Sequence, residues 1–428
     1  MVIKMQYKKA TMVIENISNL ITLKGPNRAR RSDEMSEVGL IKDGIVAVED
    51  NKIIFVGQGH LPQNIRITSE TITIDASNKL VTPGLVDSHT HLVYGGSREH
   101  EIYNKLKGTK YLDIMQAGGG IYYTVEMTKK ATFEELYKKA ERSLNRMMEF
   151  GVTTVEAKSG YGLDDFETEL KQLKVIKELN HNHPVDIVAT FLAAHAIPER
   201  YKNSSDTFVE IIITEMIPYV SEKGLAKFCD VFCEEGVFSV EQSRKILTAA
   251  KDWGLIPKIH ADELEPLGGA ELAAEIGCIS ADHLVGASEK GLKMMAEKGV
   301  IATLLPTTTF FLQSEKYADA RKMIEYGIPV VLSTDYNPGS SPTENLQLVM
   351  SFGVIKLKML PQEIITSVTI NAAASLGLEN KIGSLEEGKN ADIVIFDVPN
   401  LEYLIYNFGV NHTSTVIKNG VVVYSNNQ

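Results

Sequence analysis

Short apolar runs separated by turn residues dominate the N-terminal part of the chain, residues 1–80. Such runs are typical of β-strands. Strands are expected over residues 11–16, 44–48 and 52–57. Asp50–Asn51 predicts a tight hairpin turn between the last two strands, since both residue types tolerate the backbone of a short turn. The charged, apolar-poor segment Gly25–Glu37 is predicted to be a loop.

The C-terminal part again shows short apolar runs separated by turn residues. Residues 391–397 and 416–423 resemble strands, and Asn419–Gly420 predicts a hairpin turn within the second segment. Each end alone has few strands from which to build a core. The economical interpretation is one small β-sandwich that combines both termini.

The middle of the chain, residues 81–382, alternates apolar strands with helical stretches. Strands are expected over residues 151–156 and 186–191, and helices over 132–150, 166–179, 240–253 and 288–298. Such alternation indicates an α/β fold with parallel strands and covering helices. The length suits a (β/α)8 TIM-like barrel, and a doubly wound sheet is the second choice. The predicted domains are therefore 1–80 and 383–428 for the β-sandwich and 81–382 for the barrel.

Composition narrows the class of protein. The 428 residues are 44% hydrophobic and 23% charged, which is typical of a globular chain. The net charge of −11 argues against nucleic acid as a partner, because an acidic surface repels phosphates. No apolar run approaches the ~20 residues of a membrane span. With three cysteines and no export signal at the start, we expect a soluble cytoplasmic enzyme.

The strongest candidate for chemistry is a pair of histidines in the segment Leu85–His91. In a strand, residues two apart point to the same side, so His89 and His91 could both reach one metal ion. A packed core strand could also carry such a pair. Pro83–Gly84 and the change of texture at this point favour the metal.

Two further strand ends offer ligands. His260 closes a predicted strand that begins at Lys258, and Asp335 closes the apolar strand that begins at Val330. Active sites of such barrels lie at the C-terminal ends of strands, so these side chains could meet the histidine pair. Three imidazoles and a carboxylate suit Zn2+ or Fe2+ better than Mg2+ or Ca2+. The alternative for Asp335 is a helix cap or a turn residue.

Hydrolysis at such a metal needs a group that moves a proton. Glu263, in the loop after His260, is the natural candidate, although a single Glu is more often a solvated loop acid. His283, at the end of the next predicted strand, could hydrogen-bond the attacking water or the substrate carbonyl. Its alternative is a packed histidine.

Further candidates for substrate contacts follow predicted strand ends: Arg98, Tyr161, His195 and the turn Asn337–Ser341. Arg98 can hold a carboxylate with two parallel hydrogen bonds. A surface Arg and a core Tyr are the alternatives. Gly118–Gly120 lacks the Gly-Lys-Ser/Thr of a phosphate loop and is predicted to be a mobile loop or lid. Cys229–Cys233 fits a buried strand.

These motifs together resemble the amidohydrolase superfamily, and within it the enzymes that open an imidazolone ring in histidine degradation. The widely shared part is Pro83–His91. Further matching motifs are 117–121, 156–163, 260–263, 268–273, 280–284 and 335–340. Those that single out the narrower group are Gly118–Ile121, Lys158–Gly162 and Asn337–Ser340.

The resemblance implies hydrolysis of 4-imidazolone-5-propanoate to N-formimidoyl-L-glutamate. It implies one Zn2+ or Fe ion per subunit, held by His89, His91, His260 and Asp335. Glu263 would be the general base and acid, and His283 would assist at the attacking water. The substrate would contact Glu263 and a further set of residues: Arg98, Tyr161, His195, Asn337, Gly339 and Ser340. A homodimer is common among such enzymes.

Two alternatives stay open at this point. The first keeps the chemistry and changes the substrate, as in a deaminase or another cyclic amidase of the same superfamily. The second is a barrel without catalysis that serves as an assembly or binding protein. The complete set of ligand residues argues against the second.

Overall fold

The computed structural model describes residues 7–107 and 119–426, which fold into two compact units. The first unit comprises Met1–Asp87, Arg146–Thr154 and Asn345–Gln428, so it draws on both ends of the chain. The second comprises Ser88–Asn145 and Val155–Glu344. The domain boundaries near residues 80 and 382, which follow the change in the pattern of apolar residues, remain a prediction.

Two mixed sheets form the first unit, with the strand orders β20-β19-β18-β9-β3-β4 and β6-β5-β2-β8. Their strands are β2 (Met12–Ile17), β3 (Asn19–Ile21), β4 (Leu40–Ile41), β5 (Gly44–Glu49), β6 (Lys52–Gln58), β8 (Ile72–Asp75), β9 (Leu80–Pro83), β18 (Ile393–Phe396), β19 (Thr413–Lys418) and β20 (Val421–Ser425). The short strands β1 (Lys8–Lys9) and β7 (Ile65–Arg66) pair separately.

The two sheets share one buried core. Ile14 and Val46 from one sheet lie in the same apolar cluster as Ile393 and Ile417 from the other. Strand β18 pairs antiparallel with β9, so an N-terminal and a C-terminal strand are neighbours in one sheet. The predicted β-sandwich built from both termini is confirmed.

Both predicted hairpin turns are present. Asp50–Asn51 joins β5 to β6, and Asn419–Gly420 joins β19 to β20 with φ angles of 49° and 77°. Positive φ at both central residues is the backbone of a type I′ turn, whose twist matches that of the flanking strands. The predicted loop Gly25–Glu37 contains a short 3-10 helix, η1 (Ser32–Ser36). Buried Arg30 orders this segment by donating to the carbonyls of Leu23 and Glu37.

The second sheet system is the predicted (β/α)8 barrel. Its eight strands run in chain order: β10 (Leu85–Asp87), β11 (Val152–Lys158), β12 (Asp186–Ala194), β13 (Phe228–Cys233), β14 (Ile256–Ala261), β15 (Ser280–His283), β16 (Ile301–Leu304) and β17 (Val330–Leu332). The pairs from β12 to β17 are all parallel. Beyond the ends of the named strands, Thr90 bridges in parallel to Tyr336 and its carbonyl accepts from the N–H of Lys158.

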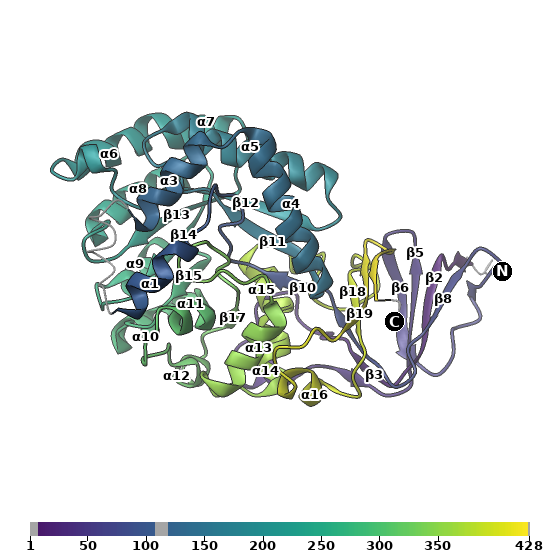
Figure 1. Cartoon of the computed structure of the whole chain (residues 1–428). Helices are drawn as coiled ribbons and strands as arrows, with labels where there is room; N and C mark the ends of the chain where they lie inside the picture. The colour runs from purple at the N-terminus through teal and green to yellow at the C-terminus, as the bar shows by residue number, and fades with distance from the viewer. Residues whose placement is uncertain (1–6, 108–118, 427–428) are drawn as a thin grey trace. The chain divides into compact units, whose positions relative to one another are not determined.

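Helices cover the outside of this barrel (Figure 1). Between the strands they are α1 (Ile102–Leu106), α3 (Gly120–Lys130), α4 (Phe133–Glu149), α5 (Phe166–Asn182), α6 (Ser205–Ile211), α7 (Ile217–Glu222), α8 (Val240–Asp252), α9 (Gly269–Ile276), α10 (Glu289–Lys298), α11 (Pro306–Phe311) and α12 (Ala320–Glu325). The first unit adds α13 (Leu346–Ile355), α14 (Pro361–Ser367), α15 (Ile370–Ser375) and α16 (Leu401–Tyr406).

All four predicted helices are confirmed as α4, α5, α8 and α10, and hydroxyl side chains cap three of their starts. The Thr132 hydroxyl accepts from the N–H of Glu135, and the Glu135 carboxylate accepts from the N–H of Thr132. Ser239 caps α8 through the same reciprocal pair with Gln242, and the Ser288 hydroxyl caps α10 by accepting from the N–H of Gly291. No helix in the described ranges has the length and apolarity to cross a bilayer.

The turn at Gly420 generates a stability prediction. A Cβ at this position would lie 1.9 Å from the Asp50 carbonyl oxygen, on a backbone with φ of 77°. Gly420→Ala should therefore lower the midpoint temperature of thermal unfolding. The decrease should exceed the one expected from the strain of a left-handed backbone alone, which costs ~1–2 kcal/mol. Gly409→Ala is the matched control, because its φ is 80° and no atom lies within 4 Å of the added Cβ. Equal midpoints for the two variants in a thermal melt would contradict the steric argument.

Candidate metal centre

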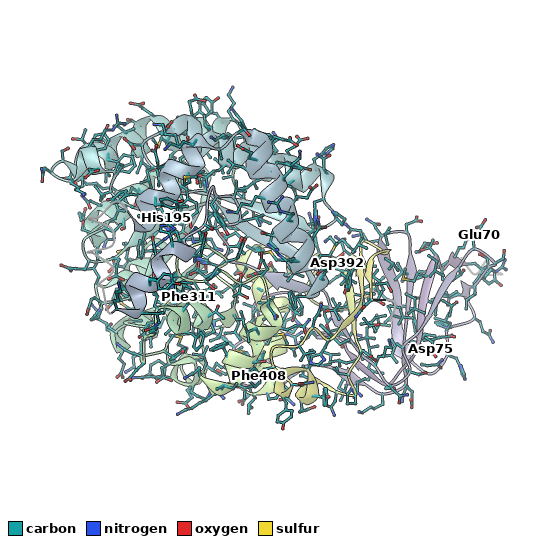
Figure 2. All side chains as sticks on the ribbon, viewed as in Figure 1. Glu70, Asp75, His195, Phe311, Asp392 and Phe408 are labelled. Atoms are coloured by element: carbon teal, nitrogen blue, oxygen red, sulfur yellow. The ribbon has the colours of Figure 1, made fainter. Side chains whose placement is uncertain are left out.

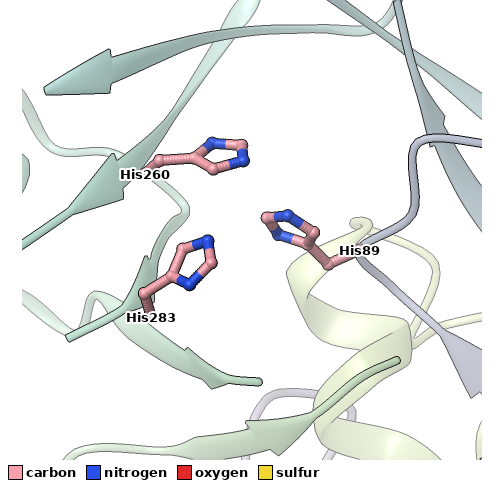
Figure 3. Close-up of side chains that lie close together, drawn as sticks. All are labelled: His89, His260 and His283. Carbon is pink, nitrogen blue, oxygen red and sulfur yellow. The ribbon is translucent and has the colours of Figure 1, made fainter. Parts of the chain in front are cut away.

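The candidate ligands gather where the barrel strands end. His260 lies in β14 and His283 ends β15, while Asp335 follows β17. Figure 3 shows the rings of His89, His260 and His283 turned toward a common space. The expectation that His89 and His91 lie within a strand is wrong, because β10 ends at Asp87. The backbone bonds of Thr90 nevertheless hold this segment between its neighbours, and both rings join the cluster.

Distances between the ligand atoms match those of a metal site. Asp335 Oδ1 lies 3.4 Å from His89 Nε2 and 3.4 Å from His91 Nε2, and His91 Nε2 lies 3.4 Å from His260 Nε2. Four ligand atoms bound at about 2.1 Å around a tetrahedral Zn2+ are separated by roughly 3.4 Å. The structure thus brings together all four residues that the sequence analysis proposed as ligands.

Buried polar atoms in this cluster lack hydrogen-bond partners. Among the described residues, His89 Nε2, His283 Nε2 and Asp335 Oδ1 are buried without a hydrogen bond. An unsatisfied buried polar atom costs about 1–3 kcal/mol, so several at one point require an explanation. A cation bound between them would satisfy these lone pairs, and imidazole with carboxylate is a donor set typical of zinc or iron. The residues present therefore fit a metal ion.

Two aspartates hold the other nitrogens of the histidine rings. Asp282 Oδ2 lies 2.7 Å from His89 Nδ1, and Asp230 Oδ2 lies 3.0 Å from His260 Nδ1. The hydrogen bond to Asp282 fixes the tautomer of His89, and the close approach of Asp230 orients the ring of His260, so that both Nε2 atoms face the proposed metal. Burial lowers the pKa of His89, but the hydrogen bond to Asp282 helps to raise it to about 9 overall.

The sequence analysis missed both aspartates. Asp282 sits inside the motif 280–284, whose histidine drew attention instead, and Asp230 sits in the segment Cys229–Cys233, which was interpreted as a buried strand. That interpretation is correct, since β13 is buried. A charged residue inside an apolar strand was the available signal, because burial of an unpaired carboxylate is costly.

Burial and charge set the protonation of the remaining groups. Burial lowers the pKa of His91 to about 4 and those of His195 and His283 well below their ordinary value, so that these rings stay neutral. Burial has the opposite effect on the pKa of Asp335, but the interactions with the nearby His89 and His91 rings hold it well below the usual range. Neutral imidazoles and an ionised carboxylate are the forms that bind metal.

Glu263 lies next to His283, with 3.6 Å between Oε2 and Nε2. Two carboxylates hold the loop that contains Glu263 through hydrogen bonds from backbone N–H groups. The Asp262 carboxylate accepts four backbone N–H groups at the start of α9, and the Glu234 carboxylate accepts those of Leu264 and Glu265. Burial, together with the charges of Asp335 and Glu234, raises the pKa of Glu263 to about 8. The carboxyl is thereby poised to exchange a proton near neutral pH.

Left-handed backbone occurs at three strand ends around the cluster. Asp262, His283 and Asp335 have φ angles of 51°, 75° and 51°. Residues with a Cβ adopt this region at a cost of ~1–2 kcal/mol, and such strain collects at functional sites. The sharp turn at each strand end aims the adjoining side chains across the barrel mouth.

Arg98 is held by a carboxylate of its own chain. Its Nε and Nη2 donate to the two oxygens of Glu101, both at 2.9 Å, and Glu101 Oε1 also accepts from the N–H of Gly120 at 2.7 Å. Gly339 packs on the Nη1 side, where a Cβ would lie 2.1 Å from that atom. Glu101 was missed by the sequence analysis, although its spacing of three residues from Arg98 was visible.

Tyr161 and His195 line the same space. The His195 ring stacks on His91 with centroids 4.7 Å apart, and the Tyr161 ring lies 5.4 Å from His195. His195 Nδ1 is 3.0 Å from the carbonyl oxygen of Gly160. Figure 2 labels His195 within the ring of barrel helices.

The predicted turn at Asn337–Ser341 is organised by Asn337. Its Oδ1 accepts from the backbone N–H groups of Gly339 and Ser340, both at 2.8 Å, and its Nδ2 donates to the carbonyl of Asp335 at 2.7 Å. The turn therefore stays next to the carboxylate of the cluster.

The predicted glycine loop is only partly visible. Gly118 lies outside the described residues. Gly119 caps helix α3 and Gly120 begins it, so the end of the motif is a helix start instead of a loop. The Gly120 N–H to Glu101 bond accounts for this, because it gives an acceptor to an N–H that the helix leaves unpaired.

Comparison with known proteins agrees with this geometry. The model of the amidohydrolase family matches residues 80–423. An imidazolonepropionase of Alkaliphilus metalliredigens (strain QYMF) is 57% identical over 412 residues, which cover 96% of this chain and 97% of that protein. An imidazolonepropionase of Geobacillus sp. (strain WCH70) is 55% identical over 415 residues, with 96% and 97% covered. The chain therefore belongs to the amidohydrolase family, and within it to the group that these imidazolonepropionases form.

Solved structures of low identity share the fold. A 5-methylcytosine deaminase from Klebsiella pneumoniae liganded with phosphonocytosine matches with a TM-score of 0.72 at 18% identity, covering 97% of this chain and 99% of that chain. An adenosine deaminase from Xanthomonas campestris with bound zinc matches with a TM-score of 0.66, also at 18% identity, covering 97% and 93%. At this identity the likeness supports the fold alone.

Proposed function

We propose that this chain hydrolyses 4-imidazolone-5-propanoate to N-formimidoyl-L-glutamate by opening the C–N bond of the cyclic amide. The observation that carries the proposal is the identity above 50% to imidazolonepropionases over nearly the whole chain. The buried cluster of histidines and a carboxylate supports hydrolysis as the chemistry. Three further expectations remain predictions. They are that the chain acts in the cytoplasm, that it binds no nucleic acid and that it forms a homodimer.

One Zn2+ or Fe ion per subunit would be held by His89, His91, His260 and Asp335. When bound, such an ion supplies the Lewis acidity that makes water a nucleophile near neutral pH. The partnerless atoms His89 Nε2 and Asp335 Oδ1 support this ligand set. Asp282 and Asp230 keep two of the rings in the required orientation.

Glu263 would take the proton from the attacking water and return it to the ring nitrogen that leaves. Its pKa near 8 lets the carboxyl perform both transfers around neutral pH. His283, 3.6 Å from Glu263, would hydrogen-bond the attacking water.

The substrate would lie between Arg98, Tyr161, His195 and the Asn337–Ser340 turn. The propanoate would contact the guanidinium of Arg98, which Glu101 holds at its Nε–Nη2 edge and which lies beside Gly339. The stacked rings of His195 and His91 would flank the imidazolone, and Ser340 with Gly339 would contact substrate or product.

The test of the proposed function is a comparison of substrates. Purified, metal-replete protein should consume imidazolonepropanoate and form N-formimidoylglutamate, detected by mass spectrometry. Cytosine and guanine serve as comparison substrates for the deaminase alternative. Turnover of either base without turnover of imidazolonepropanoate would reject the proposal.

Removal of the metal should abolish activity and lower thermal stability. An ion at one hundred times its dissociation constant contributes about 2.7 kcal/mol to folding. Chelator treatment should therefore lower the melting temperature, and added Zn2+ should restore it. His260→Ala should not respond to Zn2+, whereas His183→Ala, which changes a partly exposed histidine outside the cluster, should respond as wild type. A wild-type Zn2+ response in His260→Ala would exclude that residue as a ligand.

Glu263→Gln should retain the metal and lose most of the turnover. A positioned acid–base group contributes about 10²–10⁴-fold, and the amide cannot carry the proton. Metal content by elemental analysis and kcat by steady-state kinetics check both parts. Glu265→Gln, an exposed acid on the same loop, is the control and should turn over normally. Full activity in Glu263→Gln would exclude this residue as the essential proton shuttle.

Arg98→Met should mainly raise KM for imidazolonepropanoate. A hydrogen bond to a charged group contributes about 1.5–3 kcal/mol, which corresponds to roughly 10–150-fold. Arg244→Met removes an Arg of the surface ion pair with Glu275 and should leave KM unchanged. An unaltered KM in Arg98→Met would contradict the assignment of the propanoate.

A further inference from the structure

Beneath the histidine cluster lies a set of fully buried charged residues, of which only Asp230 and Asp282 have a role so far. Lys158 and Glu156 belong to β11, Asp230 to β13, Lys258 to β14 and Asp282 to β15, and all have no exposed surface. Three carboxylates face two ammonium groups, which leaves one negative charge in excess. Lys158 lies in the motif 156–163, in which only Tyr161 had a proposed role.

Lys158 is the centre of this set. Its Nζ lies 2.8 Å from Asp230 Oδ2, 3.0 Å from both oxygens of Glu156 and 3.7 Å from Asp282 Oδ2. An ammonium group is compact and carries three donors. It donates hydrogen bonds to Asp230 and Glu156, and the 3.7 Å to Asp282 is an ion-pair distance. Burial lowers the pKa of Lys158, but Asp230, Glu156 and Asp282 raise it above its usual range, so the group stays charged.

The oxygens that contact Lys158 are the ones that hold the histidines. Asp230 Oδ2 is also 3.0 Å from His260 Nδ1, and Asp282 Oδ2 is also 2.7 Å from His89 Nδ1. The second oxygen of each aspartate is engaged elsewhere. Asp230 Oδ1 accepts from the N–H groups of Val231 and His260, and Asp282 Oδ1 accepts from the Ser280 hydroxyl.

We propose that Lys158 is a positioning residue, which bridges Asp230 and Asp282 and thereby fixes the directions in which His260 and His89 present their Nε2 atoms. The inference rests on the metal site of the proposed function. Lys158, Asp230 and Asp282 come from alternate barrel strands, β11, β13 and β15, and alternate strands fill one layer of such a barrel. Such layers are normally apolar. A charged layer gains little net stability, because burial of ions costs as much as their attraction returns.

Lys258 provides an internal comparison. It is buried as completely as Lys158 and joins the same set, with Nζ 3.1 Å from Glu156 Oε1 and 3.3 Å from the Ser88 carbonyl oxygen. Among the described residues no ion pair joins Lys258 to Asp230 or Asp282, although its positive charge helps to lower the pKa of Asp282. The two lysines thus share burial and charge, and they differ in whether the ammonium group forms an ion pair with the aspartates that orient the ligands.

The test compares metal binding by Lys158→Met and Lys258→Met. Both variants should lower the melting temperature, because each removes a buried positive charge that faces buried carboxylates. Lys158→Met should weaken Zn2+ affinity, measured by competition with a chromogenic chelator, by about 10–100-fold, as for other residues that orient ligands. It should also change the visible spectrum of the Co2+-loaded protein. Lys258→Met should keep an affinity and a spectrum close to wild type.

The double variant Lys158→Met/Glu156→Gln covers the case in which the single variant does not fold. It preserves the net charge of the set and should fold more stably than Lys158→Met. Affinity and the Co2+ spectrum should still be altered, because the bridge between the aspartates is missing.

Wild-type affinity and spectrum in either Lys158 variant would overturn the inference, as would an equal loss in Lys258→Met. These readouts do not involve turnover of imidazolonepropanoate. A wild-type protein that binds no metal would instead reject the proposed function.

Discussion

The geometry of the barrel mouth depends on keeping imidazole and carboxylate lone pairs pointed at one place without partners of their own. Each strand end would be more stable if His89, His260 and Asp335 found ordinary hydrogen bonds. The fold prevents this by engaging the opposite atoms first: Asp282 and Asp230 hold the rings from behind. The side of each ring that faces the centre is then left for a cation.

Elements with a strong local signal could be predicted from the sequence. The hairpin turns at Asn419–Gly420 and Asp50–Asn51 and the helix start at Thr132 depend on neighbouring residues, and all three are present. The ligand set could be proposed because its motifs stand at strand ends. Asp230 could not be linked to His260, because their contact depends on the register of two adjacent parallel strands. The bridge from Lys158 was hidden as well, because it reaches from β11 to two strands that are not its neighbours in the sheet.

Different parts of the structure account for stability and for the chemistry of the site. The apolar cluster of the β-sandwich and the helices around the barrel supply burial, which is the main source of folding free energy. The charged layer around Lys158 instead orients the histidine rings of the candidate metal centre. Glu101 has a comparable relation to Arg98, since a buried carboxylate fixes the plane of a guanidinium beside the proposed substrate. In both places, one charged side chain of this protein fixes the orientation of another charged side chain near the site.

The pairing of β9 with β18 has a consequence for the order of folding during synthesis. Strand β18 is made roughly 300 residues after β9, which at about 5–20 residues per second is a delay of about 15–60 s. Throughout that interval β2, β5 and β9 have no Ile393, Ile395 or Ile417 to cover them. The nascent chain must therefore carry an incomplete apolar sheet, a natural target for chaperones, until β18 and β19 leave the ribosome.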